Sequence, residues 1–387
     1  MKKIFAVVLA VVFILNPIFL SGCNYQPKYK LVFIEQQVVD DPDWTVKGSI
    51  YIAENSNSTI QKIPVKANTI SLNINPSNDK IIYVDYENTD NGVYNETIHT
   101  ISSTDMQDKE LVRIPDNILH DDLGVPGTTS ISFEGERTFL EAYYFDHLDD
   151  SLSISIYELI DNTFTKINHF GFDPGYFFYS DNGGLLIKNA VLIVSWSSHT
   201  QNMVYDVPTG NFNTISQQGE DYSQPKFNSN ADMYVYSTYF MDKKQVCWVL
   251  NLDLEEINLV CQPMSIDRDT TGYNFNSSEH AWSPNGKYLA VSFNPANVEG
   301  DLLYLIDIQS KKPKIVAQIN HLENLRDIVW SPDSKMVGFA SYRYNSNDPF
   351  LMAHSCNIYT LSLGGKLIQE YSNPDDTVWC SFEGWLK

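Results

Sequence analysis

Histidines and acidic residues are the side chains of this sequence that could hold a metal or catalyse acid–base chemistry. None of the eight histidines lies in a His-Glu-x-x-His motif or at zinc-site spacing from a cysteine. The acidic clusters, of which Asp267-Arg268-Asp269 is one, do not match the calcium-binding loop. No glycine-rich phosphate loop and no Gly-x-Ser-x-Gly nucleophile motif occurs. The sequence therefore predicts no metal, no cofactor and no catalytic residue. His280, two residues before Trp282, is the histidine to inspect first.

Cys23 is a candidate for covalent lipidation because of the segment that precedes it. Met1-Lys2-Lys3 is a short basic start, residues 4–15 are uncharged and mostly apolar, and Leu20-Ser21-Gly22 comes directly before the cysteine. This order is typical of a lipoprotein signal, whose cysteine becomes the mature N-terminus and receives lipid. Several acyl chains, such as palmitate, anchor a protein stably, whereas one alone is marginal.

We therefore predict a signal peptide over residues 1–22, a lipidated tether over residues 23–29, and a membrane-anchored location facing outside the cytoplasm. The alternative is an uncleaved membrane helix, since residues 4–20 are near the minimum length that spans a bilayer. The placement of the Leu-Ser-Gly-Cys sequence favours lipidation.

The other four cysteines could form disulfides in an exported protein. Cys247 and Cys261 lie symmetrically about Leu254, the centre of a turn between two predicted strands. A hairpin in that register places them directly opposite each other, close enough to bridge at a non-hydrogen-bonded pair. We predict a Cys247–Cys261 disulfide, with two buried thiols as the alternative. A Cys356–Cys380 bridge would have to join two neighbouring repeats and is the second candidate.

A repeated motif predicts the strands and turns that must position these residues. Trp282-Ser283-Pro284-Asn285-Gly286 precedes an apolar run, and Trp330-Ser331-Pro332-Asp333-Ser334 repeats this pattern 48 residues later. Proline presets φ at the second turn position, Asn or Asp tolerates the third, and Gly takes the left-handed position that closes the loop. The motif predicts a strand, a tight corner and a second strand.

Weaker copies of this corner extend the repeat along the chain. With both strong copies, the anchor positions are Ile74, Ile131, Tyr179, Phe227, Trp282, Trp330 and Cys380. They lie 48 to 57 residues apart, and most units hold a second predicted strand pair. Such units predict an all-β fold, a β-propeller of four-stranded blades. Seven blades is the expected count, with six or eight as alternatives.

Closure of the ring is expected to use both ends of the chain. Seven residues, 381–387, follow the last anchor, enough for an inner strand. Three predicted strands at 30–35, 49–54 and 59–65 supply the outer part of that blade. We therefore predict that N- and C-terminal strands pair in one shared blade, and that residues 30–387 form a single propeller domain.

The Trp-Ser-Pro-Asn/Asp corner followed by an apolar strand resembles the WD-like repeat of TolB and of the propeller domain in prolyl oligopeptidase relatives. The match is specific at 282–291 and 330–339 and only pattern-level elsewhere. TolB has a globular α/β domain ahead of its propeller, for which residues 24–47 are too few, and the oligopeptidase nucleophile motif is absent. The resemblance therefore implies the fold and no functional residue.

Charge and loop lengths indicate the class of partner. A net charge of −22 argues against nucleic acid and against an anionic membrane surface. A closed ring leaves no strand edge that demands a partner, so we expect a monomer. Long insertions on a rigid ring are where propellers place recognition surfaces. The predicted insertions lie at 88–95, 116–127, 263–278 and 345–354.

These observations predict a lipid-anchored, extracytoplasmic module that binds a protein or peptide in the cell envelope. The alternative is a glycan-active hydrolase or lyase. Residues distant in the sequence converge near a propeller axis, so scattered carboxylates and histidines could gather there as an active site. A cluster of such groups at matching positions of several blades would favour the enzyme.

Overall fold

The structure is a computed structural model of the chain. It describes residues 29–38, 46–53, 60–64, 70–75, 77, 79–88, 94–119, 127–134, 137–146, 151–172, 176–178, 190–195, 201–206, 211–214, 220–221, 226–228, 233–240, 245–252, 255–263, 279–293, 301–318, 323–343, 354–375 and 378–387. Within these residues, no helix is long and apolar enough to cross a membrane.

The described strands form seven antiparallel sheets, which follow one another along the chain. The first sheet contains β29 (Val378–Leu386), β1 (Lys30–Val38), β2 (Val46–Ala53) and β3 (Ile60–Pro64). The second contains β4 (Ile70–Ile74), β5 (Lys80–Asn88), β6 (Tyr94–Ser102) and β7 (Asp108–Arg113), and is followed by the short helix α2 (Asp116–Leu119). The third contains β8 (Gly127–Glu134), β9 (Arg137–Asp146), β10 (Ser151–Ile160) and β11 (Thr163–Phe172).

The remaining four sheets follow the same plan. The fourth contains β12 (Tyr176–Phe178), β13 (Ala190–Ser195), β14 (Gln201–Asp206) and β15 (Asn211–Thr214). The fifth contains β16 (Glu220–Asp221), β17 (Lys226–Asn228), β18 (Met233–Phe240), β19 (Gln245–Leu252) and β20 (Glu255–Pro263). The sixth contains β21 (His280–Trp282), β22 (Tyr288–Phe293), β23 (Leu302–Asp307) and β24 (Lys312–Gln318). The seventh, which we call the last blade, contains β25 (Glu323–Trp330), β26 (Met336–Arg343), β27 (His354–Ser362) and β28 (Leu367–Asn373).

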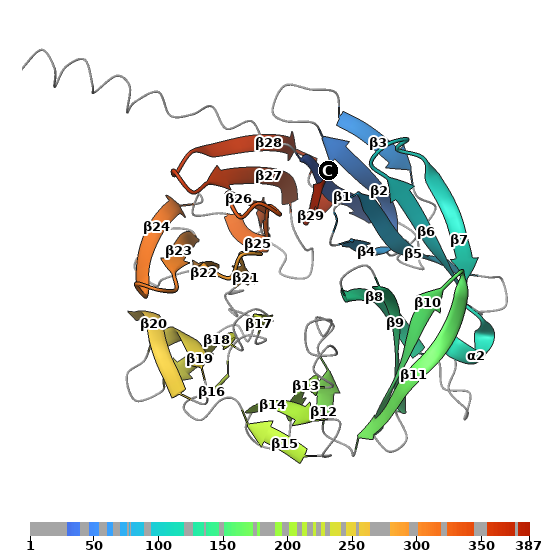
Figure 1. Cartoon of the computed structure of the whole chain (residues 1–387). Coiled ribbons are helices and arrows are strands. Elements are labelled where there is room, and N and C mark those ends of the chain that lie inside the picture. Colours follow the sequence, from blue (N-terminus) through green and yellow to red (C-terminus); the bar gives the residue numbers. More distant parts are fainter. Residues whose placement is uncertain are drawn as a thin grey trace, which may run out of the picture.

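The sheets are arranged as blades around a ring, with β4, β8, β17, β21, β25 and β29 toward the centre (Figure 1). The chain is therefore a β-propeller, as the repeat predicted. Its first sheet, which we call the closing blade, takes its inner strand β29 from the C-terminus and its other strands from the N-terminus. In it, β1 pairs with β29 from Lys30↔Leu386 to Gln37↔Val378. The predicted pairing of the two chain ends is confirmed.

The strong corner motifs form the hairpins that the sequence predicts. Trp282 pairs with Leu289, and Trp330 pairs with Val337, seven residues on in each case. The weaker anchors at Ile74 and Phe227 show the same seven-residue pairing, with Ile81 and Tyr234. The repeat was therefore aligned correctly in these four blades.

The predicted alignment was wrong at two of the remaining anchors. In the third blade Glu134 pairs with Arg137, so the hairpin turns beyond the corner predicted at 131–135. The segment Cys380-Ser381-Phe382-Glu383-Gly384 is not a corner but the middle of strand β29. In the fourth blade the second strand is β13, and the strand predicted at 185–187, with the turn after Tyr179, lies outside the described residues.

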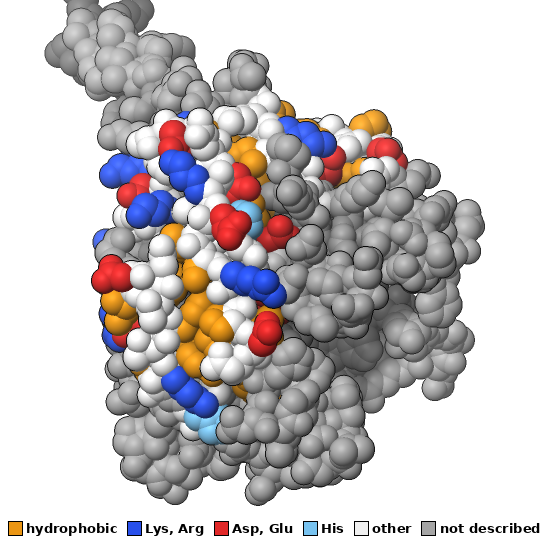
Figure 2. All heavy atoms as spheres, turned by 90° about the vertical axis from the view of Figure 1, so that its right-hand side faces the viewer, with side chains coloured by type: hydrophobic (Ala, Val, Ile, Leu, Met, Phe, Trp, Pro, Cys, Tyr) orange, Lys and Arg blue, Asp and Glu red, His pale blue; other side chains and the backbone are white. Residues whose placement is uncertain are grey.

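The hydrophobic core consists of clusters that lie between neighbouring blades. One joins the closing blade to the last blade and contains Phe33, Cys356, Cys380, Phe382 and Trp385, all at most 4% exposed. Burial falls off toward the rim. Strand β23 is buried along nearly its whole length, whereas the outermost strands β7 and β24 are mostly exposed. Figure 2 shows that the described surface on one side of the ring mixes hydrophobic side chains with basic and acidic ones.

Candidate functional site

The antiparallel strand order gives the propeller two distinct ends. In the last blade, β25 ends at Trp330 and β26 begins at Met336, so the corner between them lies at one end, which we call the corner end. The opposite end, which we call the insertion end, carries the pair Glu323↔Arg343 and the start of β27 at His354. The other blades have the same antiparallel strand order, so the same two ends continue around the ring.

All four predicted insertions connect strand ends at the insertion end. Residues 89–93 connect β5 to β6, and residues 120–126 follow α2 and lead to β8. Residues 264–278 connect β20 to β21, and residues 344–353 connect β26 to β27. These four segments lie outside the described residues, but their flanking strands fix the end of the ring from which they leave. The strand ends that flank the four insertions therefore share one end of the molecule.

The corner motif residues are structural groups at the opposite end. Ser331 is fully buried, and its hydroxyl oxygen accepts hydrogen bonds from the N–H groups of Lys335 (3.2 Å) and Met336 (2.9 Å) while donating to Asp333 (2.8 Å). Ser283 repeats this pattern, accepting from Tyr288 N–H (2.9 Å) and donating to Asn285 (2.9 Å).

The left-handed position of the corner is held by Gly286 (φ 67°) in one blade and by Ser334 (φ 59°) in the next. Gly fits this region without strain, whereas a residue with a Cβ is strained there. The Ser334 hydroxyl accepts a hydrogen bond from the N–H of Asn285 (3.1 Å), which ties the two neighbouring corners together. Pro284 and Pro332 lie in these corners as predicted.

The repeat tryptophans join one blade to the next. The indole N–H of Trp330 donates to the carbonyl oxygen of Ala281, the residue before Trp282, at 2.9 Å. The indole N–H of Trp385 donates in the same way to Val329, the residue before Trp330, at 3.3 Å. Trp385, not Cys380, is therefore the anchor of the closing blade. The prediction failed because Trp385 ends the shared inner strand and no corner follows it in the sequence.

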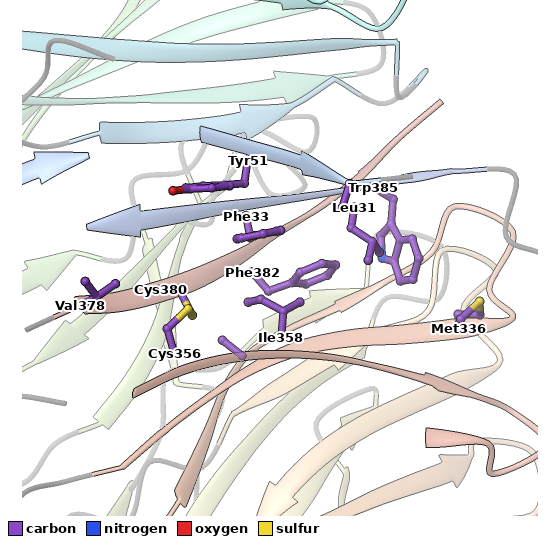
Figure 3. Close-up of a cluster of buried hydrophobic side chains, with 12 residues drawn as sticks. Leu31, Phe33, Tyr51, Met336, Cys356, Ile358, Val378, Cys380, Phe382 and Trp385 are labelled. Atoms are coloured by element: carbon purple, nitrogen blue, oxygen red, sulfur yellow. A yellow bond between two sulfur atoms is a disulfide. The ribbon is translucent and has the colours of Figure 1, made fainter. Parts of the chain in front are cut away.

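The seam between the last blade and the closing blade is held by a disulfide. Cys356 on β27 and Cys380 on β29 are bonded, with their Cα atoms 5.3 Å apart (Figure 3). This bridge was the second candidate from the sequence. For the first candidate, the structure pairs Cys247 with Cys261 across β19 and β20, but their side chains lie outside the described set. The Cys247–Cys261 disulfide stays a prediction.

A half-buried carboxylate reinforces the same seam. Glu35 on β1 accepts hydrogen bonds from the hydroxyls of Tyr51 (3.0 Å) and Tyr371 and from the amide of Asn373 (3.1 Å). Phe33 stacks on the ring of Tyr51 at 5.2 Å and packs on Tyr371 at 4.8 Å. Burial and the adjacent Glu35 raise the pKa of the Tyr371 hydroxyl, which therefore stays a donor. Polar and aromatic contacts thus converge where the chain closes.

Three carboxyl groups come from consecutive inner strands: Glu279 directly before β21, Asp327 on β25 and Glu383 on β29. Burial, reinforced by the carboxyl groups of Glu383 and Glu279, raises the pKa of Asp327 to about 7, against the opposing charge of Arg326. Burial also raises the pKa of Glu383, although Ser381 donates a hydrogen bond to it. The sequence analysis missed this group, although Glu279 and Asp327 each stand three residues before a repeat tryptophan.

Asp327 and Glu383 are both located at β-bulges. Between Arg326↔Ala340 and Val329↔Gly338, two residues of β25 face one residue of β26, and Asp327 has φ 55°. On β29, Glu383 has no partner between the pairs Val32↔Gly384 and Phe33↔Phe382. A β-bulge changes the direction in which a side chain points, and bulges occur frequently beside functional sites. Among the described residues, no group of three or more His, Cys, Asp or Glu side chains is placed to hold a metal ion.

The other predicted site residues are located as follows. His280 begins β21 and is 2% exposed, so it is a buried residue of an inner strand beside Glu279. Cys23 lies outside the described residues, and its lipidation stays a prediction.

No protein-family model matches the sequence, and no curated protein matches it. Solved structures do resemble it. The β-propeller domain of the Trilobed protease from Pyrococcus furiosus is 9% identical with a TM-score of 0.53, and the match covers 90% of this chain and 100% of that chain. Oligogalacturonate lyase from Vibrio parahaemolyticus is 10% identical with a TM-score of 0.50, covering 81% of this chain and 88% of that chain. TolB from Acinetobacter baumannii is 14% identical with a TM-score of 0.47, and the match covers 95% of this chain and 68% of that chain. At these identities, the likeness shows the β-propeller fold alone.

Proposed function

We propose that this chain is a lipid-anchored β-propeller of the cell envelope that binds a protein or peptide at its insertion end. The observation that carries the proposal is that the four insertions predicted from the sequence connect strand ends at one end of a closed ring. Binding residues are disproportionately found on loops that a rigid scaffold positions. At the opposite end, the corners of the sixth and last blades are short, and their polar groups bond to one another.

The anchor and the charge fit this proposal. A lipid on Cys23 would keep the propeller at a membrane facing outside the cytoplasm, through a tether of residues 23–29. With a net charge of −22, the protein favours a partner surface that is not strongly acidic.

The test replaces residues 264–278 or residues 345–353 with alanine blocks in the full-length lipidated protein. Chemical crosslinking in native envelopes followed by mass spectrometry then identifies bound proteins. We expect at least one block to remove a partner that the wild type captures reproducibly. Replacing the exposed corner-end residues Ser310 and Lys311 is the control and should leave capture unchanged. Retention of every partner by both block variants would contradict the assignment.

A glycan-active hydrolase or lyase is the second candidate, and the inner-strand carboxyl groups favour it. Enzymes that act on glycosidic bonds use pairs of carboxyl groups, one of which has a raised pKa and acts as the acid. Burial raises the pKa of both Asp327 and Glu383, so either group could supply the acid. If the chain is such an enzyme, purified protein should degrade an envelope or plant polysaccharide, and Asp327→Asn should abolish turnover. Asp161→Asn, on an exposed turn, is the matched control.

A further inference from the structure

The seam between β25 and β29 brings two bulged carboxyl residues together where the ring closes. Asp327 accepts a hydrogen bond from the backbone N–H of Phe382, the residue before Glu383. Trp385 bonds to the carbonyl oxygen of Val329, and a Cβ on Gly384 would lie 3.5 Å from the Val329 side chain. The C-terminal half of β29 is therefore seated directly against the bulge of β25.

We propose that Asp327 and Glu383 form a proton-dependent latch that holds the C-terminal half of β29 against β25. With at least one of the two carboxyl groups protonated, the two inner strands pack as they do in the structure. When both groups are ionised, two like charges are enclosed at one strand interface, and this end of β29 separates more readily. The Cys356–Cys380 disulfide restrains the other half of β29, so opening is confined to residues 381–386.

The groups that surround this pair reinforce the effect of ionisation. Glu279, from the segment that precedes β21, adds a third acidic group, and Arg326 on β25 is the opposing cation. Strand β21 contributes the buried His280. Strand β4, which meets β29 through Ile74, contains no titratable residue. Strand β1 contributes Glu35, which is bound by two tyrosines and Asn373, and Lys30 near the end of β29.

The direction of the pH dependence follows from linkage. Asp327 holds its proton up to about pH 7 in the folded protein, whereas its ordinary pKa in an unfolded chain is 3.8. Between these values the folded state binds more protons than the unfolded or opened state. The stability of this seam therefore falls as the pH rises from about 4 to about 7, and it levels off above that pH.

The test is hydrogen exchange by mass spectrometry on the full oxidised chain at about pH 5 and about pH 8, corrected for the intrinsic pH dependence of exchange. Protection of residues 381–386 should fall about tenfold or more at the higher pH, since each unit of separation in pKa changes the equilibrium tenfold. Asp327→Asn should abolish this fall, and Glu383→Gln should reduce it.

Asp161→Asn, an exposed turn residue with φ 47° that Asn also tolerates, should keep the wild-type pH dependence. If the Asp327→Asn variant does not fold, the latch is tested by comparing the pH dependence of protection in Glu383→Gln with that in the wild type. Protection of residues 381–386 that is independent of pH in the wild type would overturn the latch. An unchanged pH dependence in a folded Asp327→Asn variant would do the same.

Discussion

At the scale of single residues, the closing seam depends on the absence of a side chain at Gly338. A Cβ built on Gly338 would lie 2.2 Å from the ring of Phe382, which is itself 1% exposed. The ring cannot move away without leaving the core cluster between the closing blade and the last blade.

We predict that Gly338→Ala lowers the free energy of unfolding by about 1–3 kcal/mol or more, because overpacking a filled core forces side chains and backbone to shift. The control is Gly364→Ala, whose new Cβ would meet only the Ser362 hydroxyl at 3.6 Å. Urea unfolding of both variants measures the difference. Equal stability of the two variants would show that the seam tolerates the extra methyl group.

The corner serines lead to a second prediction. Ser331→Ala removes the acceptor of the Met336 N–H, a group of a buried residue, and should cost about 1–3 kcal/mol. Ser310→Ala, at an exposed turn, should change stability by no more than about 0.5 kcal/mol. Thermal denaturation of the two variants distinguishes these expectations, and a neutral Ser331→Ala would show that the corner network is dispensable.

At the scale of elements, β29 is fixed to the last blade by the disulfide and to the closing blade by pairing with β1. The double variant Cys356→Ala/Cys380→Ala removes a cross-link between residues 24 positions apart. Its free energy of unfolding should be lower by about 2–4 kcal/mol. Denaturant unfolding of the double variant and of the wild type under oxidising conditions measures the difference in free energy of unfolding. The wild type in reductant, which also lacks the bridge, is the comparison. A loss well below 1 kcal/mol would mean that strand pairing alone secures β29.

Features that depend on residues close together in the sequence could be predicted more readily than features that depend on contacts between distant residues. The corner at Trp282 is readable because its turn residues stand at fixed spacing. Trp385 has the same role without a corner, so only the pairing of β29 with β1 identifies it. The Cys356–Cys380 bridge and the hydrogen bond from the Phe382 N–H to Asp327 depend on the same long-range closure. Glu279 and Asp327 could have been found from their constant offset to the repeat tryptophans, whereas Glu383 stands only two residues before Trp385.

At the scale of the whole molecule, stability depends on closing the ring. Deleting residues 378–387 would remove Val378, Cys380, Phe382 and Trp385 from the core cluster and expose the edge of β1. Burial of large apolar side chains contributes about 1.5–3 kcal/mol each, and a whole domain is stable by only about 5–15 kcal/mol. We predict that the truncated chain loses its cooperative thermal transition. Removal of the exposed Lys387 alone is the control, and a cooperative transition in the longer deletion would contradict closure by β29.

The proposed function assigns different roles to the two ends of the ring, and one strand offers a matched comparison. Lys366 directly precedes β28 at the corner end, and Pro374 directly follows it at the insertion end; both residues are exposed. Positions 366 and 374 flank the seven residues of β28 and are therefore separated by about 26 Å.

The most direct measurement is photo-crosslinking in native envelopes from a probe at either position of the lipidated protein. We predict that the probe at position 374 gives a reproducible adduct with a protein or peptide, and that the probe at position 366 does not. An adduct from position 366 alone, equal adducts from both positions, or none from either would contradict binding at the insertion end.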